Sequence, residues 1–188
     1  MLTTRVDRAD KELFALMKEA GCWMMVFGIE SGNQGVLDRV RKGITLEQSR
    51  NAVTTAAAIG LRTVGHFIIG LPGSSPATEE DTIRFAKSLP LDFAQFYCCT
   101  AFPGSELYDW AVNEKLITVD SWAGVEQGTA NIGYPDFSAE EIQKIKRRAY
   151  NEFYFRPVFW WRFFNSFSVS ALPYLFARGM RFLKWMLK

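Results

Sequence analysis

Three nearly continuous apolar runs, separated by helix-forming stretches, constrain this chain more than any other feature. They span residues 22–29, 61–69 and 92–101, and each is followed by a turn and then by a segment with helical character. Parallel strands require long crossover connections, and the resulting sheet is covered by helices. The repeat therefore predicts an α/β fold, a partial (βα) barrel of the TIM type with parallel strands, followed by a C-terminal helical extension.

Capping residues predict where the intervening helices begin. A short strand over residues 2–6 comes first, and Asp7 or Asp10 caps the helix after it. Thr45 opens a capping box for a helix that ends before Gly60. These signals fit one βα unit after another.

Two later helices are predicted in the same way. Thr78 is expected to cap a helix over residues 79–88, and Ser138 to open one that runs to about residue 155. Residues 119–137 have no periodic pattern and are interpreted as a surface connection or a lid.

Three parts of the chain follow from this pattern. We expect the barrel segment over residues 1–118, a connecting loop and helix over 119–155, and a basic aromatic amphipathic tail over 156–188. The tail contains six basic residues and no acidic one, although the whole chain carries a net charge of only +2. So small a net charge gives no reason to expect a nucleic-acid partner.

The tail fits an apolar partner. Its last fifteen residues place cations three or four positions apart, with aromatic and aliphatic residues elsewhere around the helical turn, as in an interfacial helix. This pattern predicts peripheral attachment to a membrane surface and suits a lipidic small-molecule substrate. The alternative is that both halves of the tail pack against the barrel and cover its base or its edge.

The three cysteines, Cys22, Cys98 and Cys99, form neither an even disulfide framework nor a metal-binding spacing. No stretch reaches the length and apolarity of a membrane span, and the N-terminus does not read as a secretory signal. We therefore expect a cytoplasmic protein, with the inner membrane face as its place of peripheral attachment, and no metal ligand in the chain.

Polar residues and glycines follow each of the three apolar runs. Glu30 ends the first, His66 and Gly70 lie toward the end of the second, and Thr100 lies at the end of the third. The carboxyl ends of parallel strands meet at one edge, where βα folds bind ligands. A carboxylate can accept hydrogen bonds from ribose hydroxyls, so a nucleoside-like ligand fits this pattern. The alternative is a set of ordinary βα turns that need glycine.

Several short motifs together resemble the radical S-adenosylmethionine superfamily, in the branch whose members carry a cobalamin-binding domain. The match covers roughly residues 2–117 and corresponds to the C-terminal half of the barrel. Its motifs are Arg5-Val6-Asp7, Gly28-Ile29-Glu30-Ser31-Gly32, Lys42-Gly43, the run from His66 to Gly73, and Pro103-Gly104-Ser105-Glu106-Leu107-Tyr108.

The resemblance implies a reductive cleavage of S-adenosylmethionine by a reduced [4Fe-4S] cluster, which yields a 5′-deoxyadenosyl radical. Such a radical would act on an apolar metabolite. Methylation, cyclisation and rearrangement all remain open as the outcome. Cobalamin would be a further cofactor, bound through a domain outside this chain.

The resemblance also implies individual binding residues. Glu30, with Ser31 beside it, matches the polar position that holds the ribose, and Lys42 matches the basic position that pairs with the methionine carboxylate, with Arg41 as its neighbour. In the next strand, His66 and Ile68 match the positions that flank the adenosine, and Gly70 matches the glycine that lets the adenine approach. Thr100, near the end of the strand after that, matches a position that contacts the adenine.

The departures from the family pattern are equally informative. The cluster motif CxxxCxxC is absent, and the three cysteines present cannot replace it. The resemblance therefore implies a partner, either an upstream segment or the missing N-terminal half of the barrel, and predicts that the isolated chain lacks catalysis. The alternative function is a non-catalytic module, associated with a membrane or another protein, derived from such a barrel.

Overall fold

A computed structural model describes residues 1–119, 121, 125–126 and 128–164 of the chain. Its centre is a parallel four-stranded sheet in the order β1-β2-β3-β4, so neighbours in sequence are neighbours in space. The strands are β1 (Leu2–Arg5), β2 (Met24–Glu30), β3 (Arg62–Ile69) and β4 (Phe93–Cys98). This arrangement confirms the prediction of a partial α/β barrel with a helical C-terminus.

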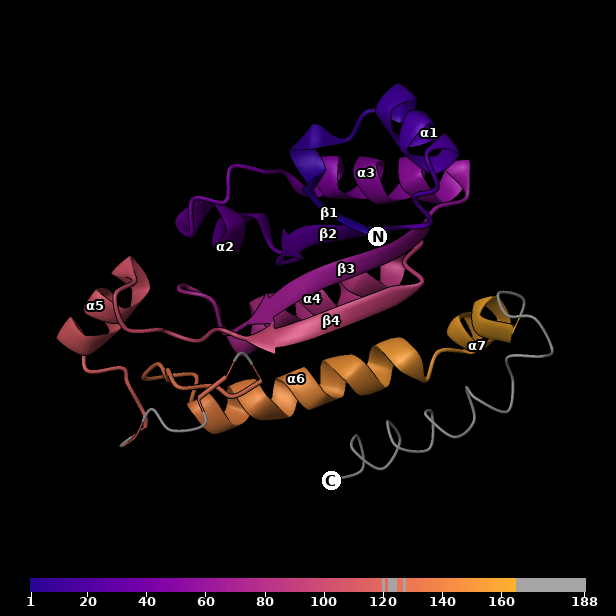
Figure 1. The fold of residues 1–188 in the computed structure, drawn as a ribbon. Helices are drawn as coiled ribbons and strands as arrows, with labels where there is room; N and C mark the ends of the chain where they lie inside the picture. Colours follow the sequence, from indigo (N-terminus) through magenta and orange to yellow (C-terminus); the bar gives the residue numbers. More distant parts are fainter. Residues whose placement is uncertain (120, 122–124, 127, 165–188) are drawn as a thin grey trace.

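The helices fall into two groups (Figure 1). Four of them cover the outer face of the sheet: α1 (Lys11–Glu19), α3 (Leu46–Ile59), α4 (Pro76–Ser88) and α6 (Ala139–Tyr154). Two short helices lie beyond the carboxyl ends of the strands: α2 (Gln34–Arg39) and α5 (Glu106–Asn113). The turn η1 (Val6–Arg8) and helix α7 (Pro157–Phe164) complete the described elements.

Local sequence explains most helix boundaries. Asp10 caps α1, Thr45 and Gln48 form the predicted capping box of α3, and Gly60 ends that helix in the left-handed conformation at φ 82°. One predicted boundary is wrong. Helix α4 begins at Pro76 and not at Glu79, because Ser75 is the cap and proline is favoured in the first turn.

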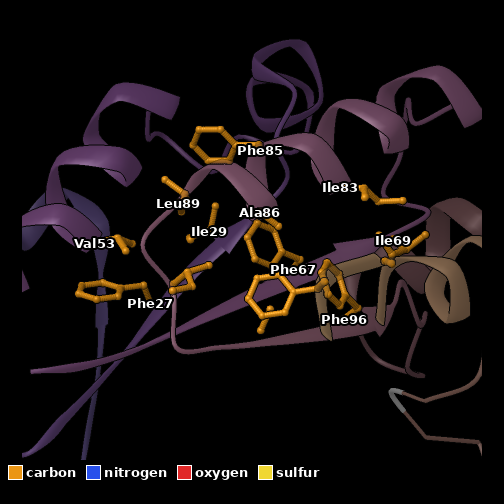
Figure 2. Packing of buried hydrophobic residues seen from close by; sticks show 14 of the residues in the cluster. Phe27, Ile29, Val53, Phe67, Ile69, Ile83, Phe85, Ala86, Leu89 and Phe96 are labelled. Carbon is orange, nitrogen blue, oxygen red and sulfur yellow. The ribbon is translucent and has the colours of Figure 1, made fainter. Parts of the chain in front are cut away.

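The core lies between the sheet and the outer helices, where aromatic residues from three adjacent strands meet (Figure 2). Phe27, Phe67 and Phe96 are each at most 2% exposed, and the Phe67 and Phe96 rings stack with centroids 5.3 Å apart. The other face of the same strands is less buried. A nearly continuous apolar run suggests a strand buried on both faces, but β2 leaves Met24, Gly28 and Glu30 partly exposed.

The free edge of β4 is occupied by side chains of α6. The Tyr154 hydroxyl lies 3.1 Å from the Ala94 amide nitrogen and 2.8 Å from its carbonyl oxygen, and the Phe96 amide donates to the Tyr150 hydroxyl at 3.2 Å. These phenols satisfy backbone groups that a further strand would otherwise bind. At the opposite edge, β1 pairs with β2 and with no other strand among the described residues.

The end of the predicted surface connection is in fact buried. Asn131 and Ile132 are fully buried, and Phe137 is 2% exposed. The Asn131 side chain accepts from the Ala101 amide and donates to the Ala101 carbonyl, both at 2.9 Å, so it acts as a substitute strand. Lack of periodicity in the sequence had indicated a loop but could not show that the loop packs inward.

The tail is described only as far as α7, and side-chain positions only as far as Trp160. Phe159 is 8% exposed and contacts the rings of Phe93 and Tyr154, so this part packs against the base of the sheet. The predicted amphipathic helix over 174–188 lies outside the described residues. Within the described part of the chain, no helix combines the length and apolarity needed to cross a bilayer.

Candidate functional site

Three adjacent strands end at one hollow of about 690 Å³. It is called the adenosyl hollow here, after the ligand that the sequence resemblance predicts for it. Five of the seven predicted site residues line it: Glu30, Lys42, His66, Ile68 and Thr100. The alternation along β2, β3 and β4 explains the grouping, because the outer-facing residues of these strands form the core. The predicted convergence of Glu30, His66 and Thr100 is therefore present.

Glu30 is held in an unusual backbone conformation at the end of β2. Its φ is 67°, in the left-handed region, and the pairing with β3 slips in register between Gly28 and Glu30. A left-handed conformation costs a non-glycine residue about 1–2 kcal/mol, and such strain often marks functional positions. The bulge turns the Glu30 carboxylate into the hollow, where its Oε1 lies 2.6 Å from the Lys42 Nζ.

Gly28 gives this ion pair its space. A β-carbon at Gly28 would lie 2.8 Å from Glu30 Oε1 and 3.5 Å from Lys42 Nζ. The Lys42 and Glu30 side chains are 22% and 17% exposed, so the pair is only partly screened by water. The absence of a side chain at Gly28 thus lets Glu30 and Lys42 approach each other.

His66 and Tyr97 form the floor of the hollow. Their rings meet edge to face with centroids 5.3 Å apart. Desolvation lowers the pKa of His66, while the Glu30 charge opposes this shift, so the imidazole is neutral at pH 7. Desolvation and, to a smaller extent, the same carboxylate raise the pKa of Tyr97. The site therefore presents a neutral imidazole and a neutral phenol.

Tyr97 was missed by the sequence prediction. It pairs in register with Ile68 and shares the inner face of the sheet with it. Side chains alternate between the two faces of a strand, and this alternation could have identified it. In the third apolar run, Tyr97 falls on the face that His66 and Ile68 occupy in the neighbouring strand. Arg5, from β1, also lines the hollow and was not predicted.

Two predicted residues do not line the hollow. Ser31 is 2% exposed, and its hydroxyl lies 3.2 Å from the Thr82 hydroxyl of α4. A β-carbon at Gly70 would lie 2.7 Å from Ile142 Cδ1, so the position of its absent side chain faces α6. The ligand contacts predicted for these two residues remain predictions. In the structure, Ser31 joins β2 to α4 and Gly70 lets α6 approach β3.

A buried carboxyl group stands behind Gly70. Glu79 of α4 is 2% exposed and accepts from the Gly70 amide at 2.7 Å through Oε1, while Oε2 has no hydrogen-bond partner among the described residues. Desolvation raises the pKa of Glu79 to about 7, against the opposing effects of the Gly70 amide and the Ser74 hydroxyl. On the other side, the Tyr134 hydroxyl donates to the Gly70 carbonyl at 2.8 Å.

The cysteines of this chain do not fit an iron–sulfur cluster. Cluster ligands are thiolates, but burial raises the pKa of Cys98 to about 11 and that of Cys99 to about 12. Cys22 lies at the other end of the sheet, before β2. No group of three His, Cys, Asp or Glu residues suited to a metal ion occurs in the described part of the chain.

Comparisons with known proteins show which family the chain resembles. Residues 1–86 match the model of the Radical SAM superfamily. The chain is 39% identical over 155 residues to an uncharacterized methyltransferase of Pyrococcus horikoshii, which covers 82% of this chain and 34% of that protein. It is 33% identical over 121 residues to the cytidylyl-2-hydroxyethylphosphonate methyltransferase of Streptomyces wedmorensis, covering 61% of this chain and 23% of that protein.

Among solved structures, the chain superimposes on the coproporphyrinogen III oxidase of Escherichia coli, a radical SAM enzyme, with a TM-score of 0.57. The sequence identity is 16%, and the match covers 80% of this chain and 31% of that protein. The chain thus spans about a third or less of the length of these relatives. It belongs to the radical SAM superfamily.

Proposed function

We propose that this chain is the C-terminal part of an enzyme that binds S-adenosylmethionine in the adenosyl hollow and cleaves it reductively to a 5′-deoxyadenosyl radical. The substrate of that radical is an apolar metabolite. The observation that carries the proposal is the convergence of Glu30, His66 and Thr100, from three neighbouring strands, on one hollow.

The donor set suits an adenosyl ligand. Glu30 would accept the ribose hydroxyls, since its Oε2 makes no hydrogen bond among the described residues. Lys42 would pair with the methionine carboxylate while it keeps Glu30 in place. His66 and Ile68 would flank the adenosine.

The cluster that supplies the electron belongs outside this chain in our proposal, since the described cysteines do not fit it. A partner, either an upstream segment or a separate N-terminal half of the barrel, would bring the CxxxCxxC motif and pair with the edge of β1. Cobalamin would bind through a further domain. The isolated chain would bind S-adenosylmethionine weakly and would not cleave it.

Titration calorimetry with S-adenosylmethionine tests the binding role. Glu30→Gln should weaken binding at least tenfold, as should His66→Ala, whereas Glu47→Gln, an exposed and remote control on α3, should leave it unchanged. Equal affinities for all four proteins, or no binding by the unaltered chain, would sink the proposal. Anaerobic reconstitution with iron and sulfide should give no stoichiometric cluster on this chain.

The tail over residues 156–188 supports a second proposal about location. A basic aromatic segment favours peripheral attachment of a cytoplasmic protein to an anionic membrane, where a lipidic substrate would be met. Phe159 favours the alternative, a tail packed on the barrel, at least for its first turn. Deleting residues 160–188 should abolish co-sedimentation with anionic liposomes, and unchanged binding would contradict membrane attachment.

The non-catalytic module remains the competing function. It would keep the fold and the tail but would have no use for the adenosyl hollow. Adding a fragment that supplies CxxxCxxC and the missing strands distinguishes the two, because only the enzyme part would then support cleavage of S-adenosylmethionine.

A further inference from the structure

A second hollow, here called the arginine hollow, adjoins the adenosyl hollow and has a volume of about 540 Å³. Its lining residues come from the end of α2, from helix α5 and from the turn that follows β3. Leu71 and Leu107 line both hollows, so the two are neighbours. The charged residues of the arginine hollow are Arg39, Arg41 and Glu106. None of the site residues predicted from the sequence lines this hollow.

The end of α2 divides adjacent basic residues between the two hollows. Helix α2 ends at Arg39, and Arg41 adopts the left-handed conformation at φ 52°. This reversal leaves Arg41 in the arginine hollow, while the next residue, Lys42, lines the adenosyl hollow and pairs with Glu30. The two cations therefore serve different sites, although they are neighbours in sequence.

The walls of the arginine hollow are built by the same turn that ends β3. The Arg39 side chain packs on Gly73, where a β-carbon would overlap its Cδ and lie 3.0 Å from its Nε. Trp110 of α5 contacts the Tyr134 ring at a centroid distance of 6.4 Å, and Tyr134 is bonded to Gly70. The Arg39 stem thus packs on the turn that follows β3, and the indole is linked to the same turn through Tyr134.

The two arginine side chains of the arginine hollow remain available to bind a ligand. Neither the Arg39 nor the Arg41 guanidinium forms an ion pair or a hydrogen bond in the described part of the chain. Glu106 is the one carboxylate on the lining, which leaves an excess of one positive charge. Guanidinium groups bind carboxylates and phosphates through paired hydrogen bonds, and Trp110 offers an apolar surface beside them.

We propose that the arginine hollow binds the oxyanion group of an amphipathic substrate, with Arg39 and Arg41 on the anion and with Trp110 and Leu107 on its apolar body. The inference rests on the proposed function, because the apolar body would extend past Leu71 toward the adenosyl hollow. The chemical class is a carboxylate or phosphate ester of an otherwise apolar molecule. Arg39 and Arg41 would then determine which substrates bind.

Calorimetric titration of the chain with octyl phosphate, octanoate and octan-1-ol tests this assignment. We expect the two anions to bind and the alcohol to bind at least tenfold more weakly; the tighter of the anions identifies the head group as phosphate or carboxylate. Replacing both arginines, Arg39→Gln with Arg41→Gln, should weaken anion binding at least tenfold. The pair Arg39→Lys with Arg41→Lys should lose part of the affinity, since it keeps charge without the fork.

The matched control removes the same charge elsewhere: Arg8→Gln with Arg147→Gln, two exposed positions outside the hollow. It should bind the anions as the unaltered chain does. Equal losses in both double variants, or equal binding of anion and alcohol, would overturn the assignment. Binding of S-adenosylmethionine, measured on the same proteins, should not change with Arg39 and Arg41. If the unaltered chain did not bind S-adenosylmethionine, that result would count against the proposed function and not against the anion site.

Discussion

The two faces of the central sheet differ, although the same strands form both. On the outer face, Phe27, Phe67 and Phe96 are packed under helices to 2% exposure or less. On the inner face, the alternate residues Gly28, His66 and Tyr97 border an open hollow. Because side chains alternate along a strand, one stretch of chain can supply a rigid base and a polar site at the same time.

Because the two faces differ, neighbouring residues of one strand should have different roles: one stabilises the fold and the next contributes to binding. The outer residues contribute free energy of folding through burial of apolar area, at about 25 cal/mol per Å². The inner residues bury less area and leave polar atoms available for a ligand. Substitutions of adjacent residues should therefore have opposite consequences, which the following predictions test in order of decreasing effect on stability.

The largest effect is expected for Phe67→Ala on the outer face. Removing a fully buried ring that stacks on Phe96 should lower the free energy of unfolding by about 3–5 kcal/mol. Urea unfolding followed by circular dichroism measures it. A loss below about 1 kcal/mol would show that the outer face is not the stabilising one.

Glu79 should make the outer side sensitive to pH. Its folded pKa, about 7, lies above its usual value of 4.5, so the folded state holds the proton more tightly than the unfolded state. This contribution is fully present below pH 4.5 and is lost as the pH rises to 7, by about 3 kcal/mol in total at 1.36 kcal/mol per pKa unit. Glu79→Gln, which mimics the protonated acid, should remove that part of the pH dependence.

Urea midpoints of the unaltered chain and of Glu79→Gln, measured from pH 4.5 to 8, supply the comparison. The variant should be the more stable protein at pH 8, and the difference should shrink toward acidic pH. Parallel curves for the two proteins would mean that the Glu79 carboxyl is not the group responsible.

Gly28→Ala tests the inner face by steric means. The new methyl group would meet Glu30 Oε1, the end of a flexible side chain, so the cost in stability should be about 1 kcal/mol or less. The ion pair with Lys42 must shift, however, and binding of S-adenosylmethionine should weaken about tenfold. Calorimetry and urea unfolding on the same sample measure the two effects, and a stability loss as large as that of Phe67→Ala would contradict the separation.

The smallest change in stability is expected for His66→Ala, next to Phe67 on the same strand. His66 makes one ring contact and no hydrogen bond among the described residues, so its removal should cost about 0.5 kcal/mol. Urea unfolding beside Phe67→Ala gives the sharpest form of the comparison. Similar losses for the two neighbours would mean that both faces stabilise the fold equally.

Much of the fold could be predicted from sequence because its signals are local. The apolar runs identified the strands, and Thr45, Gly60 and Ser138 gave helix boundaries that the structure confirms. The start of α4 was mistaken because two possible caps, Ser75 and Thr78, lie three residues apart and form the two halves of one capping box. Local chemistry alone did not decide which of them was the cap.

The site was predictable only as far as strand alternation reaches. Glu30, His66 and Thr100 could be grouped because the carboxyl ends of parallel strands converge. The inward position of Asn131 and the burial of Glu79 depend on contacts between elements that are distant in sequence, and no local pattern announces them. The arginine hollow likewise depends on α5 lying opposite the end of α2.

The hydroxyl groups of Tyr150 and Tyr154, seated on β4, limit how copies of this sheet can join. With that edge occupied, β1 is the one sheet edge in the described part of the chain that is left for main-chain pairing between molecules. A molecule with one free sheet edge forms closed dimers, whereas a molecule with two free edges forms open-ended fibrils. Concentrated solutions of the chain should therefore contain dimers rather than fibrils, and a strand supplied at β1 should dissolve the dimers.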